Sequence, residues 1–266
     1  MRGAGALDVQ PPDDHFELRL AETGADLAAA QRLRYEVFVA ELGGDGPLVD
    51  HAGRFERDAF DPHFDHLILV DRRRDAAALD HVVGVYRLMT SERAAAVGRF
   101  YGEDEYDLAP LKRSGRKLLE LGRSCVHRDY RGGTALFHLW NGLAAYVLER
   151  EIEILFGVAS FHGTDVVALA EPLSHLHHRF LAPEDLRVRV VPDHFQSMDL
   201  MPAGRIDRKR AMLAMPHLIK AYVRLGGFVG EGAYVDRAFN TVDVCLLMDT
   251  GRMNAQARSR YTRGRA

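Results

Sequence analysis

The segment from Lys117 to Tyr146 constrains the fold of this chain most, because it predicts a strand, a glycine turn and a helix in direct succession. Residues 117–126 are mainly apolar and predict the strand. From Thr134 onward, apolar residues recur at helical spacing: Leu136, Leu139, Leu143 and Val147. The turn between them contains Gly132 and Gly133. Such a turn points backbone N–H groups and the positive end of a helix dipole at one place, so we expect an anion site there, most simply for a phosphate.

The predicted strand also carries a carboxylate, Glu120, and a guanidinium, Arg123. Residues three apart on a regular strand face opposite sides of the sheet. Gly122 favours a β-bulge at Leu121–Gly122, which would bring both charges to one side and splay this strand from the one predicted at residues 155–160. A carboxylate and a guanidinium beside a phosphate turn are typical of a transferase site. A salt bridge on an edge strand explains the pair equally well.

The rest of the chain alternates strands and helices, so the predicted class is α/β with a mixed central sheet. Further strands are expected at residues 16–21, 66–71, 82–89, 153–161, 186–191, 229–235 and 244–248, and further helices at 26–42, 165–180 and 210–225. Asp26 is the expected cap of the first helix, and Pro216 should kink the last. Residues 1–14 are expected to form a flexible tail, 15–250 a single domain, and 251–266 a basic tail with five arginines.

Composition excludes some classes of protein. A net charge of −3 argues against a nucleic-acid partner. The two cysteines, Cys125 and Cys245, fall in predicted buried strands, which indicates a reduced, cytoplasmic protein. The first residues lack an apolar signal core, and no run approaches the roughly 20 apolar residues of a membrane span. We therefore expect a cytoplasmic protein that touches the membrane peripherally at most.

Several segments resemble a known superfamily. Residues 126–133 (VHRDYRGG) resemble the acyl-donor loop of the GNAT N-acyltransferases, and residues 221–228 (AYVRLGGF) resemble their late helix-to-strand signature. The segments GVASFHGTD, MPHLIKAYVRLGG and AYVDRAFNTVDV together resemble the bacterial ornithine N-acyltransferases. This resemblance implies a GNAT-like domain, with a mixed, splayed central sheet flanked by helices. It also implies transfer of a 3-hydroxyacyl chain from acyl carrier protein to the α-amine of ornithine, the first step to ornithine lipids.

The first half of the chain also resembles the acyl-homoserine-lactone synthases, which share an ordered set of charged and aromatic residues. Here the set falls on Arg34, Phe38, Asp58, Asp61, Arg87, Glu120 and Arg123. The resemblance implies that the first five bind substrate. We add Ser160, on the predicted strand of the GVASF segment, to this substrate-binding set.

The acyl-donor loop departs from the usual superfamily pattern, which places a further glycine two positions on to cradle the coenzyme A pyrophosphate. Here Gly132-Gly133-Thr134 lacks that spacing. A shortened cradle suits the single phosphodiester of a phosphopantetheine arm, which favours a carrier-protein donor over free coenzyme A. The residues expected to bind this arm are Val126, Arg131, Gly132, Gly133 and Thr134.

Acyl transfer to an amine needs a neutral amine, a polarised thioester and a proton for the leaving thiolate. Glu120 is the expected base, directly or through a water, and Arg123 is expected to orient it or to bind a carboxylate. Tyr222 stands where the superfamily often places the general acid, although packing also explains a tyrosine on an amphipathic helix. Asp58 and Asp61 could hold the ammonium groups of the acceptor, or could instead cap and solvate their loop.

Arg34 and Arg87 could pair with those two acids or with the acceptor carboxylate, and an arginine inside an apolar strand needs a fixed partner. His175, His177 and His178 are interpreted as surface histidines, because no cysteine or acid completes a metal set by spacing. Cys125 is expected to be an inert core thiol. Basic residues could dock an acidic carrier protein, or could simply be a solvated face: Lys112, Arg113, Arg116, Lys117, Arg205, Arg208, Lys209 and Arg210.

The predicted protein is therefore an acyl-carrier-protein-dependent amino-acid N-acyltransferase, with L-ornithine as the first choice of acceptor. It should hold no cofactor and no metal, and its partners should be acyl carrier protein, a small amino acid and, peripherally, the inner membrane. Three alternatives remain: the same reaction on glutamine or another amino acid, a signal-lactone synthase, and a non-catalytic module that binds carrier protein. The segment MPHLIKAYVRLGG argues against the second, and the combination of Glu120, Arg123 and the phosphate loop argues against the third.

Overall fold

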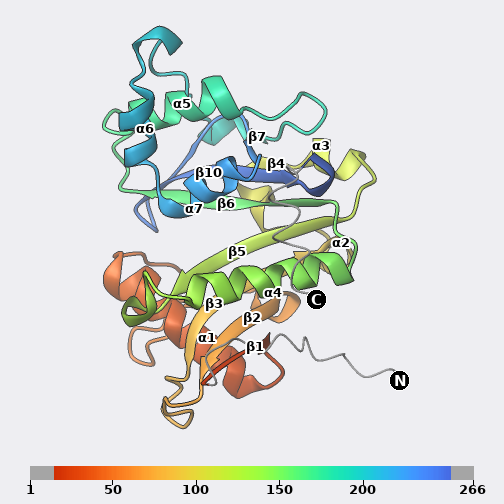
Figure 1. Ribbon diagram of the computed structural model, residues 1–266, viewed down its shortest axis with the longest axis vertical. Helices are drawn as coiled ribbons and strands as arrows, with labels where there is room; N and C mark the ends of the chain where they lie inside the picture. Colours follow the sequence, from red (N-terminus) through yellow and green to blue (C-terminus); the bar gives the residue numbers. More distant parts are fainter. Residues whose placement is uncertain (1–14, 253–266) are drawn as a thin grey trace. The chain divides into compact units, whose positions relative to one another are not determined.

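The computed structural model describes residues 15–252 (Figure 1). The predicted tail at 1–14 and most of the predicted basic tail, from residue 253 on, lie outside the described residues. Contacts group the described residues into two compact units, one of residues 15–89 and 121–151 and the other of residues 90–120 and 152–252. The expectation of a single domain over residues 15–250 stays a prediction.

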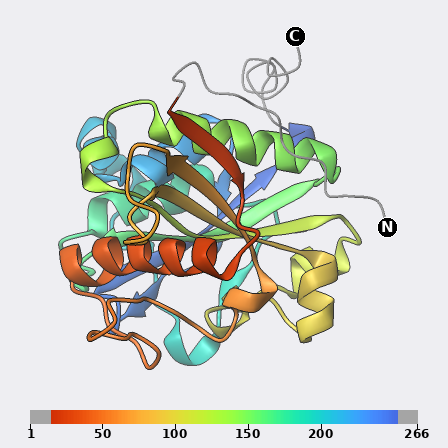
Figure 2. The same cartoon turned by 90° about the horizontal axis from the view of Figure 1, so that it is seen from below.

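The first unit is a sheet with a helix on each face. Strands β1, β2 and β3 pair antiparallel, and the end of β5 follows β3 in the strand order. Figure 2 shows α1, in red-orange, on one side of these strands and α4, in green, on the other. The elements of this unit are β1 (Phe16–Leu20), α1 (Gly24–Arg34), β2 (Asp65–Asp71), β3 (Val82–Thr90), β5 (Leu118–Val126) and α4 (Ala135–Glu149), with the last residue of β3 and the first three of β5 in the other unit.

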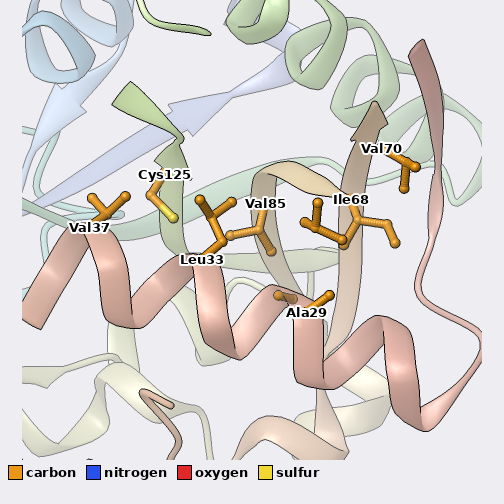
Figure 3. Close-up of a cluster of buried hydrophobic side chains, with 9 residues drawn as sticks. Ala29, Leu33, Val37, Ile68, Val70, Val85 and Cys125 are labelled. Carbon is orange, nitrogen blue, oxygen red and sulfur yellow. The ribbon is translucent and has the colours of Figure 1, made fainter. Parts of the chain in front are cut away.

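The alternation of side chains along β2 explains why both faces of this sheet are covered. Ile68 and Val70 join the apolar cluster under α1, where Leu33 and Val85 meet them (Figure 3). The alternate residues face α4, which comes unusually close because Gly142 has no side chain. A Cβ at Gly142 would lie 2.6 Å from Leu18 and 3.2 Å from Leu67. A sheet buried on both faces is the reason why β2 is almost continuously apolar.

Helical structure covers nearly all of the predicted range 26–42, but the capping residue and the type of helix in the last turns differ from the prediction. It is capped by Thr23 rather than by Asp26, which lies at the third helical position and completes a reciprocal capping box. After Arg34 the chain continues as a π-helix, Tyr35–Glu41. Such segments are rare and occur frequently at functional sites.

The second unit contains the other strands. Strands β6 and β10 pair antiparallel over their full lengths, β8 and β9 pair with β10, and Leu118–Glu120 of β5 pairs parallel with Ile154–Phe156 of β6. The strands are thus mixed and mostly antiparallel, which confirms the predicted α/β class. The remaining elements are α2 (Ser91–Val97), β4 (Tyr106–Asp107), α3 (Ala109–Arg113), β6 (Ile154–His162), α5 (Ala170–Phe180), β7 (Arg189–Val190), α6 (Arg208–Ala214), α7 (His217–Arg224), β8 (Phe228–Val229), β9 (Tyr234–Asp236) and β10 (Thr241–Asp249).

Proline divides the helix predicted at 210–225 instead of kinking it. Residue Met215 is extended, as expected for a residue before proline, and α7 begins only after Pro216. The helix predicted from residue 165 begins at Ala170, because a turn in which Asp165 accepts backbone hydrogen bonds comes first. None of the helices within residues 15–252 has the length and apolarity to cross a bilayer.

Strand β5 has a local irregularity at Arg123, while the bulge predicted at Leu121–Gly122, with Glu120 and Arg123 on one side, stays a prediction. Arg123 has a φ of 49°, in the left-handed region, whereas Gly122 does not. A side chain at Gly122 would meet nothing nearer than 3.8 Å, so lack of space is not the reason for glycine there. The left-handed conformation costs an ordinary residue roughly 1–2 kcal/mol, so interactions of the Arg123 side chain must offset it.

Candidate active site

Six charged side chains of the first unit form one connected group, here called the arginine–carboxylate cluster. Arg34 ends α1, Arg87 lies on β3 and Arg123 on β5, while the three acids come from the loop before β2. Three guanidinium groups and three carboxylates balance in charge, which is the condition for burying such a group. The cluster consists of Arg34, Glu56, Asp58, Asp61, Arg87 and Arg123.

Asp61 is the centre of this cluster. Its Oδ1 lies 2.6 Å from Arg34 Nη1 and 2.9 Å from Arg87 Nη1, and its Oδ2 accepts a hydrogen bond from Gln31 at 2.9 Å. Arg34 also donates from Nε to Glu56. The Arg87 guanidinium lies 4.2 Å from the centre of the Phe64 ring, a distance suited to a cation–π contact. These contacts confirm that the buried arginine of β3 has fixed partners.

Opposite charges keep the cluster ionised despite burial. Burial alone would raise the pKa of Glu56, but Arg123 and Arg34 outweigh it and lower that pKa from 4.5 to about 2. The pKa of Asp61 is likewise held well below its usual range by Arg34 and Arg87, against the effect of burial. In turn Glu56 and Asp61 raise the pKa of Arg34, although its burial acts in the opposite direction. Carboxylates with such low proton affinity are poor general bases near neutral pH.

Exposure separates the members of the cluster into two groups. The side chains of Arg34, Glu56, Asp61 and Arg87 are at most 2% exposed, whereas those of Asp58 and Arg123 are 18% and 16% exposed. Arg123 contacts Glu56 at 3.2 Å and Asp58 at 3.5 Å, and these contacts offset the strain of its backbone. Asp58 and Arg123 can therefore meet a ligand, while the buried Arg87 contacts Asp58 and the buried Glu56 contacts Arg123.

Glu120, in the second unit, is held by backbone hydrogen bonds instead of arginines. Its side chain is buried, and its two carboxylate oxygens accept hydrogen bonds from the backbone N–H groups of Tyr101, at 2.8 Å, and Gly102, at 2.6 Å. These donors open the short 3₁₀ turn Tyr101–Asp104. A Cβ at Gly102 would lie 2.9 Å from Glu120 Oε1, so glycine is required for this approach. These two N–H donors fix the orientation of the carboxylate.

The glycine turn predicted between β5 and α4 is present in the first unit, and its role in binding phosphate stays a prediction. A 3₁₀ turn covers Arg128–Tyr130, Gly132 is left-handed with a φ of 79°, and α4 begins after Thr134. The Thr134 side chain does not cap α4, so it does not use the first N–H groups of the helix. Of the residues predicted to bind phosphopantetheine, Val126 ends β5, and the other four follow between it and α4: Arg131, Gly132, Gly133 and Thr134. An anion would meet the positive end of α4 here.

Three other predicted residues occupy less specific places. Tyr222 is buried on α7, and Ser160 is exposed on β6 opposite Asp243 of β10. Phe38 lies on the π-helix and packs partly against the apolar cluster of Figure 3. Their roles in binding or catalysis stay predictions.

The histidines on α5 require two corrections. His175 is buried rather than at the surface, and burial lowers its pKa. An acid does join His177 and His178, because Asp199 lies within 4.8 Å of their ligand atoms, a geometry that could hold a metal ion. Spacing hid this residue, since it follows in a distant loop. His178 Nε2 lies 3.1 Å from Asp199 and 3.0 Å from the Met201 carbonyl, whereas His177 Nδ1 is buried without a hydrogen-bond partner among the described residues.

Other expectations about reactivity and charge have mixed outcomes. Cys125 is a buried thiol, and burial raises its pKa to about 12, which confirms it as an inert core residue.

Some of the basic residues proposed to dock a carrier protein already have acidic partners. Arg116 pairs through both terminal nitrogens with Asp249 at 2.7 Å, and Lys112 pairs with Glu103. Arg116 is therefore a structural residue, whereas Arg113 is exposed.

Sequence reasoning missed three features of these sites. Glu56 belongs to the cluster, although the sequence around it reads as an ordinary charged loop. The backbone donors at Tyr101 and Gly102 leave no pattern of side chains to detect. Glu41, at the end of the π-helix, contacts two arginines of the phosphate turn. In each case the partner is distant in sequence, so spacing carries no signal.

Comparisons with known proteins agree with this geometry. Residues 33–141 match the family model described as "Acetyltransferase (GNAT) domain". An N-acyl amino acid synthase from uncultured soil microbes superposes with a TM-score of 0.50 at 12% identity, covering 91% of this chain and 97% of its own. A CoA-dependent acyl-homoserine lactone synthase also gives 0.50, at 14% identity, with 90% and 82% covered. The matched model and the fold identify a GNAT-like domain in this chain.

Sequence relatives narrow the class further. An L-ornithine N(alpha)-acyltransferase of Rhodobacter capsulatus is 62% identical over 248 residues, covering 93% of this chain and 95% of the relative. A protein of the same name from Brucella abortus is 42% identical, with 92% and 88% covered. The chain belongs to the L-ornithine N(alpha)-acyltransferase family.

Proposed function

We propose that this protein transfers a 3-hydroxyacyl chain from acyl carrier protein to the α-amine of L-ornithine. The product, an N-acylated ornithine with a free hydroxyl on its acyl chain, would be the precursor of an ornithine lipid. Similarity along nearly the whole chain to proteins named for ornithine acylation supports the acceptor. The observation that carries the proposal is the arginine–carboxylate cluster, which offers one partly exposed acid and one partly exposed arginine.

This pair suits the groups of an α,ω-diamino acid. Asp58 would bind an ammonium group of ornithine, and Arg123 would bind its carboxylate through a charge-assisted pair. The buried members of the cluster would hold both side chains in place, so that little side-chain entropy is lost on binding. Glutamine has an uncharged amide in place of the second ammonium, so it could not form the ion pair with Asp58 in this way.

Glu120 would accept a proton from the α-ammonium, directly or through a water. The amine lone pair then attacks the thioester carbonyl carbon, the carbonyl electrons move to oxygen, and their return expels the thiolate. Tyr222 would donate its proton to that thiolate and take up the second proton that the nitrogen loses as the amide forms, so the tyrosine is regenerated and Glu120 releases its proton to solvent. The reaction forms one amide bond, breaks one C–S bond and leaves the carrier protein with a free thiol. The turn from Val126 to Thr134 would hold the phosphodiester of the pantetheine arm.

The acceptor is tested with purified protein and a 3-hydroxyacyl-loaded carrier protein. Mass spectrometry would measure the rate of N-acylation of L-ornithine, L-lysine and L-glutamine. We expect ornithine to react fastest, lysine, one methylene longer, to react about 10–100 times more slowly, and glutamine to react more slowly still. A faster reaction with glutamine would move the acceptor assignment to that amino acid.

The donor is tested with the same acyl chain on carrier protein and on coenzyme A. Carrier protein should give the higher kcat/KM. Arg113→Glu should lower the kcat/KM for carrier protein and make this value less sensitive to salt concentration, because Arg113 is an exposed cation at the end of α3. Arg116→Glu is unsuitable, since it would break the pair with Asp249. Equal rates with both donors would overturn the carrier-protein proposal. We place the reaction in the cytoplasm, with peripheral contact at the membrane that receives the product.

A further inference from the structure

Glu41 already contacts both arginines of the predicted phosphate turn. One carboxylate oxygen lies 2.8 Å from Arg131 Nη1, and the other accepts a hydrogen bond from Arg128 Nε at 3.3 Å. Arg131 also donates from Nε to the Val126 carbonyl at 3.0 Å. The remaining acid of the turn, Asp129, is largely exposed and lies beside His127. An anion that enters the turn must therefore compete with the Glu41 carboxylate for the same guanidinium groups.

The position of Glu41 is set by the fold rather than by the ion pairs. It is the last residue of the π-helix, and its side chain is 16% exposed, whereas those of Arg128 and Arg131 are 62% and 46% exposed. Val37, four residues earlier, points toward Cys125 at the end of β5 (Figure 3). The apolar contact thus holds the π-helix beside the strand that leads into the turn. Glu41 is therefore the more buried partner of these ion pairs, and Arg128 and Arg131 are the more exposed ones.

We infer that Glu41 is a specificity-determining residue that discriminates between acyl donors by their charge. A phosphopantetheine arm brings one phosphodiester charge to the turn. Free coenzyme A brings a pyrophosphate and a further phosphate monoester, about four negative charges at neutral pH. The anchored carboxylate of Glu41 repels coenzyme A more strongly than a phosphopantetheine arm. It also pairs with the arginines that would otherwise neutralise the phosphates of coenzyme A. This inference rests on the proposed function, because it assumes that the turn binds the donor phosphate.

The test compares three proteins: wild type, Glu41→Gln and Glu36→Gln. Glu36 lies on the same π-helix and pairs with Arg54 instead, at 2.6 Å, so its replacement removes the same charge from the same segment. For each protein, kcat/KM is measured with one 3-hydroxyacyl chain on carrier protein and on coenzyme A. In Glu41→Gln the ratio of coenzyme A to carrier protein should rise about tenfold, and the rise should shrink at high salt. In Glu36→Gln the ratio should stay near that of wild type.

A binding measurement separates this inference from the proposed function. Calorimetry with 4′-phosphopantetheine and with coenzyme A needs no turnover and no carrier protein. Glu41→Gln should strengthen coenzyme A binding about tenfold more than phosphopantetheine binding. An unchanged ratio, or an equal change in Glu36→Gln, would overturn the role of Glu41. A wild-type enzyme that ignores carrier protein would overturn the donor proposal alone, because the two binding constants would still report on Glu41.

Discussion

Two buried glutamates in this chain differ in what holds them. Glu56 is 1% exposed and is held by the guanidinium groups of Arg34 and Arg123 in the first unit. Glu120 is 3% exposed and is held by two backbone N–H groups in the second unit. Arginine partners lower the pKa of Glu56 to about 2, against the effect of burial, so that it serves as a fixed anion. Burial alone therefore does not tell the two glutamates apart, whereas the groups that hold each of them do.

Glu120→Gln should have the largest effect, on catalysis. The amide cannot accept the proton of the acceptor amine, so turnover should fall by about 10²–10⁴. One backbone N–H would face the new amide group, so unfolding free energy should fall by about 1–3 kcal/mol. Steady-state kinetics with carrier-protein donor and denaturant unfolding measure the two effects. Glu103→Gln, in the same 3₁₀ turn, removes the same charge and should leave turnover within roughly a factor of two. Near-normal turnover of Glu120→Gln would remove it as the base.

Glu56→Gln should act on stability instead. It leaves the buried Arg34 guanidinium and the partly buried Arg123 short of one anion, which costs about 3–5 kcal/mol of unfolding free energy. Urea unfolding followed by circular dichroism measures the loss. Glu36→Gln, which breaks the exposed pair with Arg54, is the matched control and should cost no more than about 1 kcal/mol. If both variants unfold alike, the cluster is not the structural support described above.

Lowering the pH should reproduce part of this loss of unfolding free energy in the wild-type protein. The pKa of Glu56 is 4.5 in an ordinary environment and about 2 when folded, so its stabilising effect is complete above pH 4.5 and disappears as the pH falls toward 2. This difference corresponds to roughly 3 kcal/mol. Unfolding free energies measured across that window should fall less steeply for Glu56→Gln, which lacks the group. Parallel curves for the two proteins would show that other carboxylates account for the acid sensitivity.

Gly102→Ala should give the smallest effect. The new methyl group would lie 2.9 Å from Glu120 Oε1, so the carboxylate or the turn must move by a few tenths of an ångström. Such a displacement of a base should lower turnover by about tenfold and leave the fold intact. Gly204→Ala provides the control, because a Cβ there meets nothing within 4 Å. Equal turnover of the two variants would mean that the close approach of the amides to Glu120 has no catalytic role.

Interactions between residues close in the sequence made some elements of this protein predictable. The β5–turn–α4 segment was predictable because its strand, its two glycines and its helical period all act over a few residues. The order of strands and helices followed for the same reason. The resemblance placed Arg34, Asp58, Asp61, Arg87 and Arg123 in one functional set, and the structure brings these five into contact.

Tertiary structure decided the rest. Glu56, the amides at Tyr101 and Gly102, and the contact of Glu41 with the phosphate turn join residues from 18 to 90 positions apart. The left-handed backbone at Arg123 and the π-helix after Arg34 were likewise not predicted from the sequence. Periodicity reports which face of an element is buried, but it does not report which group lies opposite that face. The partners of a buried side chain depend on that group, so only the folded chain shows that arginines hold Glu56 whereas backbone amides hold Glu120.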